Sequence, residues 1–260
     1  MTLGDSPALV VAGFMKCATT TMYTWLAAQP EFSSTGSKET NFLAHDDLWR
    51  QGPSRYAELL GAGGGELLLD VSPSYLSPEF TERAATRFVE LAIDAPVAVL
   101  YRDPVERAVS HLRHQVRRGR VAVDLDAAAA ELTADSPYVQ ASRYRNCLEP
   151  WLQRLDPDRM VFIDQADLAT GWRSVLAAVG LEWRPPPTES ANVASDLPAY
   201  SPLARALVDR GFSRPPAWVP AWSRRVGRRL LLRSPVASAP PIDAIRDAMP
   251  SESRALLDTD

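Results

Sequence analysis

Four short, mostly apolar runs along the chain predict buried β-strands. They span residues 8–12, 66–71, 96–101 and 160–163. Runs of this length, bounded by turn-forming residues, suit strands better than helices. Helix-like spacing follows them, as between residues 20 and 28, where apolar side chains recur at helical intervals. Strands that alternate with helices predict a parallel sheet with right-handed crossovers and helices on both faces.

We therefore expect an α/β protein with a single-domain, three-layer fold around a central parallel sheet. A chain of 260 residues lies at the upper end of single-domain size. After Gly180 the periodicity fades, and proline-rich breaks separate helix-like pieces at residues 203–209, 222–232 and 242–257. We expect one domain over residues 1–260, in which residues 1–181 form the α/β core and residues 182–260 an irregular helical cap.

Polar segments with little periodicity follow three of the predicted strands, at residues 14–21, 70–75 and 102–107. In parallel α/β folds, ligands gather at the carboxyl ends of the strands, so we expect the binding site there. The glycine cluster at residues 61–65 precedes a strand instead of opening a helix. This position favours a flexible turn over a phosphate loop.

The first polar segment reads Gly-Phe-Met-Lys-Cys-Ala-Thr-Thr-Thr over residues 13–21 and predicts an anion site. A loop that leaves a strand and opens a helix presents backbone N–H groups at the positive end of the helix dipole. Gly13 permits the turn, Lys16 supplies a point charge, and residues 19–21 supply hydroxyl donors and an N-cap. A plain strand–helix connection with a threonine cap is the alternative.

The spacing in this loop differs from that of a Walker A loop, G-x-x-x-x-G-K-[ST], in which lysine directly precedes the hydroxyl residue that holds magnesium. Here Lys16 follows Gly13 by three positions, two residues separate it from Thr19, and the second glycine is missing. A magnesium-dependent kinase is therefore the less favoured function.

Composition narrows the function classes further. A net charge of −4 argues against a general nucleic-acid binder, which usually has a basic domain. Cys17 and Cys147 lie far apart, so they predict neither a disulfide framework nor a zinc site and fit a reducing compartment. The sequence has no run of about 18 apolar residues and no basic start of a signal peptide. We expect a cytoplasmic protein without stable membrane insertion.

Lysine is rare in this chain. Of the 28 basic side chains only two are lysines, Lys16 and Lys38. The wide, planar guanidinium of arginine is a poor substitute for an ammonium that packs against a phosphate or sulfate. The restriction of lysine to these two positions suggests that both meet an anion, and chance placement is the alternative.

Four segments resemble, in order, the sulfotransferases that use 3′-phosphoadenosine 5′-phosphosulfate (PAPS), and together they extend over residues 9–181. Residues 13–21 resemble the 5′-phosphosulfate loop, and Tyr-Arg-Asp-Pro-Val-Glu-Arg-Ala-Val-Ser-His at residues 101–111 resembles the 3′-phosphate motif. Ser-Lys-Glu-Thr-Asn-Phe at residues 37–42 resembles the Lys-Glu motif of the heparan-sulfate and related bacterial branch. Residues 144–168 resemble the helix and strand that follow in that branch. Four ordered matches are more specific than any single motif.

The resemblance implies a fold and a donor. The fold is the P-loop NTPase-like topology of the sulfotransferases, with residues 1–181 as the nucleotide-binding core and residues 182–260 on the acceptor side. The donor is PAPS, the product is adenosine 3′,5′-bisphosphate, and no metal is needed. The implied donor contacts are Lys16 on the 5′-phosphate and bridging oxygen, Cys17, Ala18, Thr19, Thr20 and Thr21 in the same loop, and Arg102 and Ser110 on the 3′-phosphate.

The 3′-phosphate motif also predicts local structure. Proline is favoured at the first position of a helix, so we expect Pro104 to start a helix that includes Ser110. Arg102 and Ser110 would then face one phosphate. A salt bridge from Arg102 to Asp103 or Glu106 is the alternative.

The implied chemistry is transfer of a sulfuryl group to a hydroxyl, less favourably an amine, of a small molecule or a carbohydrate-containing acceptor. Glu39 is the implied general base, and Lys38 beside it is expected to contact the sulfuryl group or to tune Glu39. Asp70, at a strand end, is the competing base, with a turn cap as its other alternative. The runner-up function is a small-molecule kinase that uses ATP and magnesium, in which Asp70 would hold the metal.

The chain departs from the resemblance at several positions. Ala18 stands where the family usually has glycine, and Thr40 and Asn41 replace a Pro-His pair, so the heparan-sulfate acceptor is not carried over. No lysine follows Lys38, so closure over the nucleotide would fall to arginine. The basic C-terminal segment also allows a non-enzymatic alternative, a peripheral membrane or partner-binding protein. The available arginines in that segment are Arg224, Arg225, Arg228 and Arg229.

Overall fold

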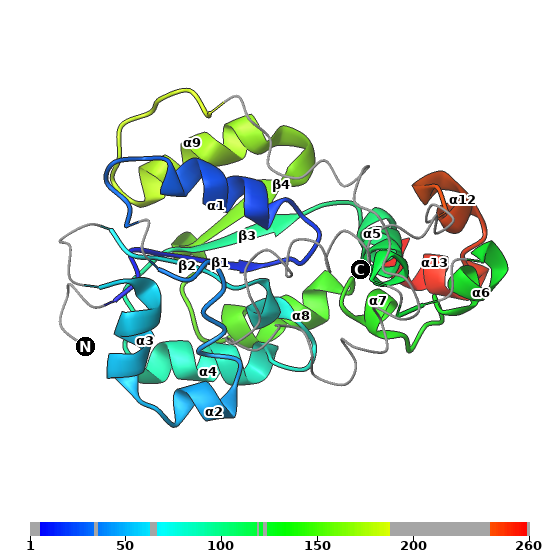
Figure 1. Ribbon diagram of the computed structural model, residues 1–260, viewed down its shortest axis with the longest axis horizontal. Coiled ribbons are helices and arrows are strands. Elements are labelled where there is room, and N and C mark those ends of the chain that lie inside the picture. The colour runs from blue at the N-terminus through cyan, green and yellow to red at the C-terminus, as the bar shows by residue number, and fades with distance from the viewer. Residues whose placement is uncertain are drawn as a thin grey trace, which may run out of the picture. The chain divides into compact units, whose positions relative to one another are not determined.

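The computed structural model in Figure 1 describes residues 6–33, 36–62, 67–118, 120–121, 124–187 and 240–258. The described residues form two compact units, and each unit is described by itself. The first unit contains the described residues up to 107 together with residues 141–187. The second unit contains the described residues from 108 to 140 together with residues 240–258.

A four-stranded parallel sheet in the order β2-β1-β3-β4 forms the centre of the first unit. The predicted α/β fold class and the four predicted strands are confirmed. β2 covers only the last three residues of the apolar run at residues 66–71, and Leu67 forms an isolated bridge with Phe32. The strands are β1 (Leu9–Gly13), β2 (Leu69–Val71), β3 (Val97–Tyr101) and β4 (Met160–Asp164).

The strand order reverses next to β1. From β1 the chain moves to β2 on one side, and it then crosses to β3 on the other side of β1. In open parallel sheets the ligand crevice forms at such a reversal, outside the carboxyl ends of the strands. The loops that follow β1 and β3 are therefore the expected walls of a site.

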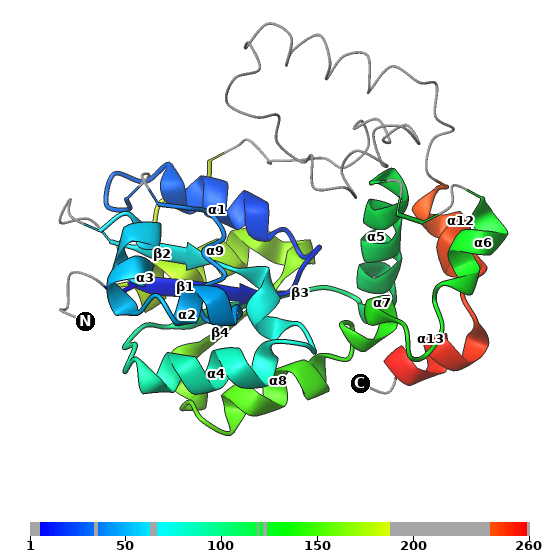
Figure 2. The same cartoon turned by 60° about the horizontal axis from the view of Figure 1, so that its bottom comes forward.

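Helices cover both faces of the sheet, which gives the three predicted layers (Figures 1 and 2). On one face the rings of Trp25 and Trp172 meet edge to face, with centroids 5.9 Å apart. On the other face Phe88 and Trp151 pack with centroids 5.5 Å apart. The first face bears α1 (Thr19–Ala27) and α9 (Leu168–Ala178), and the second bears α2 (Asp46–Trp49), α3 (Pro53–Leu60), α4 (Thr81–Glu90) and α8 (Tyr144–Leu152). Single turns of 3-10 helix are η1 (Pro73–Leu76), η2 (Pro157–Arg159) and η3 (Gln165–Asp167).

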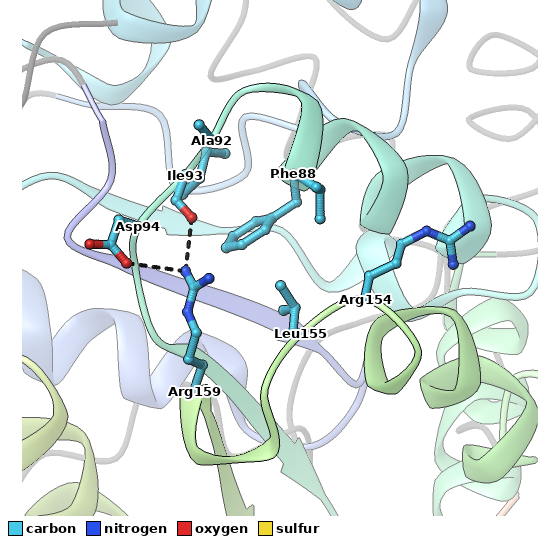
Figure 3. A pocket seen from close by; sticks show the side chains of 8 residues that line it. Phe88, Ala92, Ile93, Asp94, Arg154, Leu155 and Arg159 are labelled. Carbon is cyan, nitrogen blue, oxygen red and sulfur yellow. Dashed lines mark hydrogen bonds and ion pairs between the residues drawn. The ribbon is translucent and has the colours of Figure 1, made fainter.

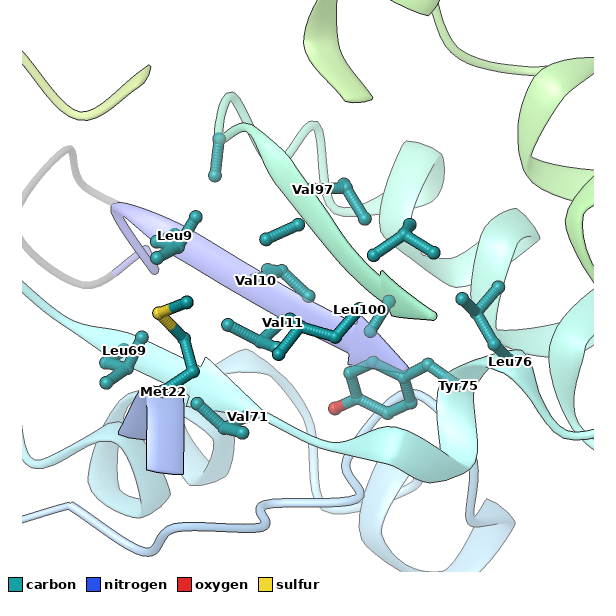
Figure 4. Close-up of a cluster of buried hydrophobic side chains, with 14 of the residues drawn as sticks. Leu9, Val10, Val11, Met22, Leu69, Val71, Tyr75, Leu76, Val97 and Leu100 are labelled. Carbon is teal, nitrogen blue, oxygen red and sulfur yellow. The ribbon is translucent and has the colours of Figure 1, made fainter. Parts of the chain in front are cut away.

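The core lies between the sheet and these helices, and Figure 4 shows its centre around β1. Every residue of β1 is buried, as expected for a parallel strand covered on both faces. Met22 of α1 and Tyr75 of η1 are among the side chains of this cluster. β2 is buried along its whole length as well, so the core holds the carboxyl ends of both β1 and β2 in place.

The second unit is helical. α5 begins in the first unit at Pro104, as predicted, and its residues from Ala108 onward belong to the second unit. Arg113 Nε donates to the carbonyl oxygen of Pro240 at 3.1 Å, and α12 packs against α6. The elements are α5 (Pro104–Arg117), α6 (Leu125–Ala130), α7 (Pro137–Gln140), α12 (Ile242–Asp247) and α13 (Ser251–Asp258).

The helix-like piece expected at residues 242–257 is helical and consists of two helices. It divides into α12 and α13 at Pro250, which lacks the N–H that a continuous helix needs. The other two helix-like pieces and the arginines at 224–229 lie outside the described residues, so the division into core and cap stays a prediction. Among the described helices, none combines the length and apolar character that crossing a membrane requires. The cytoplasmic location also stays a prediction.

Candidate active site

The loop between β1 and α1 places two non-glycine residues in the left-handed region. Lys16 has φ of 76° and Ala18 has φ of 63°. Ala18 is the N-cap of α1, and no side chain caps the helix, so the predicted threonine cap is wrong. Thr19 is instead the first helical residue. Its side chain and that of Thr21 are buried.

The side of this loop that faces the protein interior is apolar. Cys17 is buried, its N–H donates to the carbonyl oxygen of Phe14 at 3.1 Å, and its Sγ lies 3.8 Å from Tyr144 Oη. Burial raises the pKa of the Cys17 thiol to about 11. The ring of Phe14 packs on that of Tyr144 with centroids 4.2 Å apart. Cys17 is therefore a neutral, inward-facing thiol at neutral pH.

Tyr144 and Arg107, to which the sequence analysis gave no role, connect this loop to the segments around Arg102 and Ser142. Tyr144 Oη donates to the carbonyl oxygen of Arg102 at 3.0 Å. Arg107 is 1% exposed, and its guanidinium donates to Ser142 Oγ at 2.6 Å and to the carbonyl oxygen of Met15 at 3.5 Å. Burial lowers the pKa of Arg107, but a guanidinium stays charged at neutral pH. The signal for Arg107 was its place inside the 3′-phosphate motif.

The 3′-phosphate motif begins where β3 ends. Asp103 caps α5, since its Oδ1 accepts the N–H of Glu106 at 2.8 Å. Arg102 Nη2 lies 3.3 Å from Glu106 Oε2, and each of these two side chains is 21% exposed. This is the salt-bridge alternative for Arg102. Ser110 lies on α5 in the second unit, and its shared role with Arg102 stays a prediction.

Lys38 and Glu39 form an exposed ion pair beside the end of β2. Lys38 Nζ lies 2.5 Å from Glu39 Oε1, and the two side chains are 25% and 48% exposed. The N–H of Val71 donates to the carbonyl oxygen of Lys38 at 3.3 Å, which fixes the segment against β2. Glu39 therefore has the access to solvent that a base needs in order to meet an acceptor.

Asp70 is placed differently from the sequence-based expectation. Its carboxylate is fully buried and accepts hydrogen bonds from four hydroxyl groups, those of Thr40, Tyr56, Ser72 and Tyr75. Burial raises the pKa of Asp70, and the four hydrogen bonds oppose that effect. Because its oxygens face hydroxyls inside the protein, Asp70 is a poor candidate for the base or for a magnesium ligand. Among the described residues, no group of three histidine, cysteine or acidic side chains is arranged to hold a metal.

The predicted site residues of the first unit meet at one edge of the sheet. The N–H of Phe14 donates to the carbonyl oxygen of Leu100 at 2.6 Å, so the loop after β1 begins beside the end of β3. On the other side of β1, the N–H of Ser72 donates to the carbonyl oxygen of Val11 at 3.1 Å. The loop with Lys16 and Arg102 therefore follow neighbouring strand ends, and the Lys38–Glu39 pair lies beside the end of β2, the next strand.

Figure 3 shows a pocket at the opposite end of the sheet. Arg159, which precedes β4, donates to the carbonyl oxygen of Ile93 at 2.8 Å and pairs with Asp94, before β3. Parallel strands have all their amino ends at this edge, so the pocket lies away from the three polar segments. It is lined by Phe88, Val89, Ala92, Ile93, Asp94, Arg154, Leu155 and Arg159.

Comparison with known proteins finds relatives in sequence and in structure, whereas no family model matches the sequence. Heparan sulfate glucosamine 3-O-sulfotransferases 3B1 and 3A1 of Mus musculus are each 24% identical over 164 residues, which is 60% of this chain and 40% of each mouse protein. The chain thus matches less than half the length of these curated relatives. A crystal structure of a sulfotransferase from Alicyclobacillus acidocaldarius aligns with a TM-score of 0.60 at 19% identity, over 80% of this chain and 91% of that one.

Proposed function

We propose that this chain, which is similar to sulfotransferases in sequence and in fold, is a sulfotransferase that transfers a sulfuryl group from PAPS to an acceptor hydroxyl. The observation that supports this most is the meeting of three polar segments, each with a basic side chain, at one sheet edge. They are the loop with Lys16, the Lys38–Glu39 pair and the loop with Arg102. An amine is the less favoured acceptor group.

Donor binding would rest on both ends of the nucleotide. Lys16 would contact the 5′-phosphate and the bridging oxygen, while the first N–H groups of α1, which have no acceptor within the helix, would point at the same phosphate. Ala18 would contribute through the main chain, and residues 19–21 through N–H groups and the Thr20 hydroxyl. The N–H of Cys17 already donates to the carbonyl oxygen of Phe14, so Cys17 would support the loop from inside instead of contacting the donor. Arg102 and Ser110 would hold the 3′-phosphate. The guanidinium of Arg102 would then contact both the 3′-phosphate and the carboxylate of Glu106.

The reaction is a displacement at sulfur. The acceptor oxygen attacks the sulfur atom, Glu39 takes the proton of the acceptor, and the bond between sulfur and the bridging oxygen of the 5′-phosphate breaks. The products are the sulfated acceptor and adenosine 3′,5′-bisphosphate. Lys16 would neutralise the leaving phosphate and Lys38 the sulfuryl oxygens, so most of the catalysis is positioning and electrostatics.

The acceptor is proposed only as a class. The names of the mouse relatives point to a glucosamine-containing polysaccharide, which favours a carbohydrate-containing or small hydroxylated acceptor here. Thr40 and Asn41 stand where the heparan-sulfate branch has a Pro-His pair, so heparan sulfate itself is not proposed. The kinase alternative is weakened by Asp70, whose oxygens are occupied by hydroxyl donors.

A binding experiment tests the donor. Isothermal titration should show tighter binding of adenosine 3′,5′-bisphosphate, without metal, than of ATP with magnesium. Preference for ATP with magnesium would overturn the proposal in favour of the kinase. Incubation with PAPS and a panel of phenols and sugars, followed by a search for a mass increase of one SO₃ group, then identifies the acceptor.

A further inference from the structure

We propose that Asp70 is a positioning residue for Glu39, through three hydroxyl groups that hold the main chain directly after the proposed base. This inference rests on the proposed function and deepens it. Asp70 would touch neither donor nor acceptor. It would instead act on the geometry of the Lys38–Glu39 pair from inside the protein.

The hydroxyl groups donate to the two oxygens of one buried carboxylate. Ser72 Oγ donates to Asp70 Oδ1 at 2.6 Å. Thr40 Oγ1 donates to Oδ2 at 2.9 Å, and Tyr75 Oη does so at 2.7 Å. Tyr56 of α3 adds a fourth hydroxyl, at 2.7 Å from Oδ2. The carboxylate therefore links α3, the turn after β2 and the segment that contains Glu39.

Three of these hydroxyls also accept backbone N–H groups, and the N–H groups belong to three consecutive residues. The N–H of Asn41 donates to Ser72 Oγ at 3.0 Å. The N–H of Phe42 donates to Thr40 Oγ1 at 3.3 Å, and that of Leu43 donates to Tyr75 Oη at 3.3 Å. The main chain begins to be held in this way two residues after Glu39.

The direction of these hydrogen bonds depends on the charge of Asp70. A hydroxyl has one proton, so a hydroxyl that donates to Asp70 turns its lone pairs toward the backbone N–H groups. An ionised carboxylate can only accept, which forces this orientation on all three hydroxyls at once. A neutral amide at the same position would present two donors, and at least one hydroxyl would have to turn around.

The energetic cost of burying the Asp70 carboxylate suggests that this residue does more than fill space in the core. A buried charge is costly, and replacing buried charged groups by well-packed apolar ones is often neutral or stabilising. The four donors to Asp70 are neutral hydroxyls, which offset only part of this cost. Glu39 is half exposed and pairs with a flexible lysine, so its placement depends on how firmly the main chain beside it is held.

The matched pair Thr40→Val and Thr40→Ser tests the inference, with Asp70→Asn as a third variant. Thr40→Val keeps the shape and removes one hydroxyl, while Thr40→Ser keeps the hydroxyl. In Thr40→Val and Asp70→Asn, hydrogen exchange at the N–H groups of residues 41–43 should become about 10-fold faster or more. Thr40→Ser should behave like the wild type.

The same variants separate positioning from folding. Affinity for adenosine 3′,5′-bisphosphate should stay within about twofold of the wild type, while kcat for PAPS with water or 2-naphthol as acceptor falls about 10-fold or more. Unchanged exchange at residues 41–43 in both Thr40→Val and Asp70→Asn would overturn the inference. So would equal damage in Thr40→Ser and Thr40→Val.

Failure of the proposed function would look different. A wild-type protein that does not bind adenosine 3′,5′-bisphosphate would remove the proposed donor, and with it the role of Glu39 that Asp70 is proposed to support. Normal donor binding and turnover together with unchanged exchange in the variants would remove only the role of Asp70.

Discussion

The two lysines of this chain lie at the same sheet edge, but different kinds of interaction hold their two segments in place. The loop with Lys16 is fixed by main-chain geometry, with left-handed residues above and the buried Cys17 and Phe14 below. The segment with Lys38 is fixed by polar contacts, since hydroxyls anchored on Asp70 hold the residues after Glu39. The first arrangement suits a rigid cradle for a phosphate. The second supports a base that is itself exposed.

This difference shows how far a short sequence motif determines the conformation of each segment. The loop with Lys16 takes its shape mostly from nine consecutive residues, 13–21. The Lys38–Glu39 segment takes its shape from Tyr56, Asp70, Ser72 and Tyr75, which are far away in the sequence. Four variants or measurements can sharpen or break the contrast.

Lys16→Ala should have the largest effect. Loss of the charge that is proposed to face the leaving phosphate should lower turnover of PAPS by about 1,000-fold and weaken binding of adenosine 3′,5′-bisphosphate. Lys16→Arg is the matched control, and it should recover little, because a planar fork does not replace a compact ammonium. Full activity of either variant would show that the loop is only a strand–helix connection.

Glu39→Gln should affect chemistry alone. Without the proposed base, kcat should fall about 100-fold or more, whereas affinity for adenosine 3′,5′-bisphosphate should remain that of the wild type. Glu58→Gln, at an exposed glutamate paired with Arg55, is the control and should be silent. A parallel loss of nucleotide affinity in Glu39→Gln would mean that the two lysine segments are not separate in function.

Cys17 should react slowly with alkylating reagents in the folded protein. A pKa of about 11, against an ordinary 9.0, reduces the thiolate fraction at pH 8 about 100-fold. Peptide mapping after iodoacetamide treatment, with the urea-unfolded protein as reference, measures this rate at Cys17 separately from Cys147. Rapid alkylation would contradict the apolar, interior-facing side of the loop with Lys16.

Ala18→Gly should have the smallest effect, and it should be stabilising. Alanine in the left-handed region costs about 1 kcal/mol or more, and glycine removes this cost at the expense of greater freedom in the unfolded chain. We expect a net gain of about 0.5–1 kcal/mol in the free energy of unfolding, measured by urea denaturation. Ala57→Gly, inside α3, is the control and should lose about 1 kcal/mol. A loss in Ala18→Gly would show that the loop is unstrained at this position.

Much of the fold follows from local patterns in the sequence. The four apolar runs became the four strands, and Pro104 starts α5 because proline suits the first position of a helix. The cap of α1 was not predictable, because a left-handed alanine depends on tertiary contacts around the loop. The surroundings of Asp70 were hidden for the same reason, since Tyr56 belongs to a separate helix. Arg107 lies inside the segment that resembles the 3′-phosphate motif, but its burial depends on Ser142 and Met15, which are distant from it in the sequence.

The buried guanidinium of Arg107 has a consequence for how donor affinity depends on salt concentration. It is 1% exposed and lies beneath the loop with Lys16, where it donates to Met15 and Ser142. Mobile ions screen exposed charges within about 8 Å at physiological salt but screen buried charges far less. Donor affinity should therefore keep a component that salt does not remove. Titration of adenosine 3′,5′-bisphosphate at rising salt would show it as a plateau, and affinity that vanishes in salt would place the attraction wholly on surface residues.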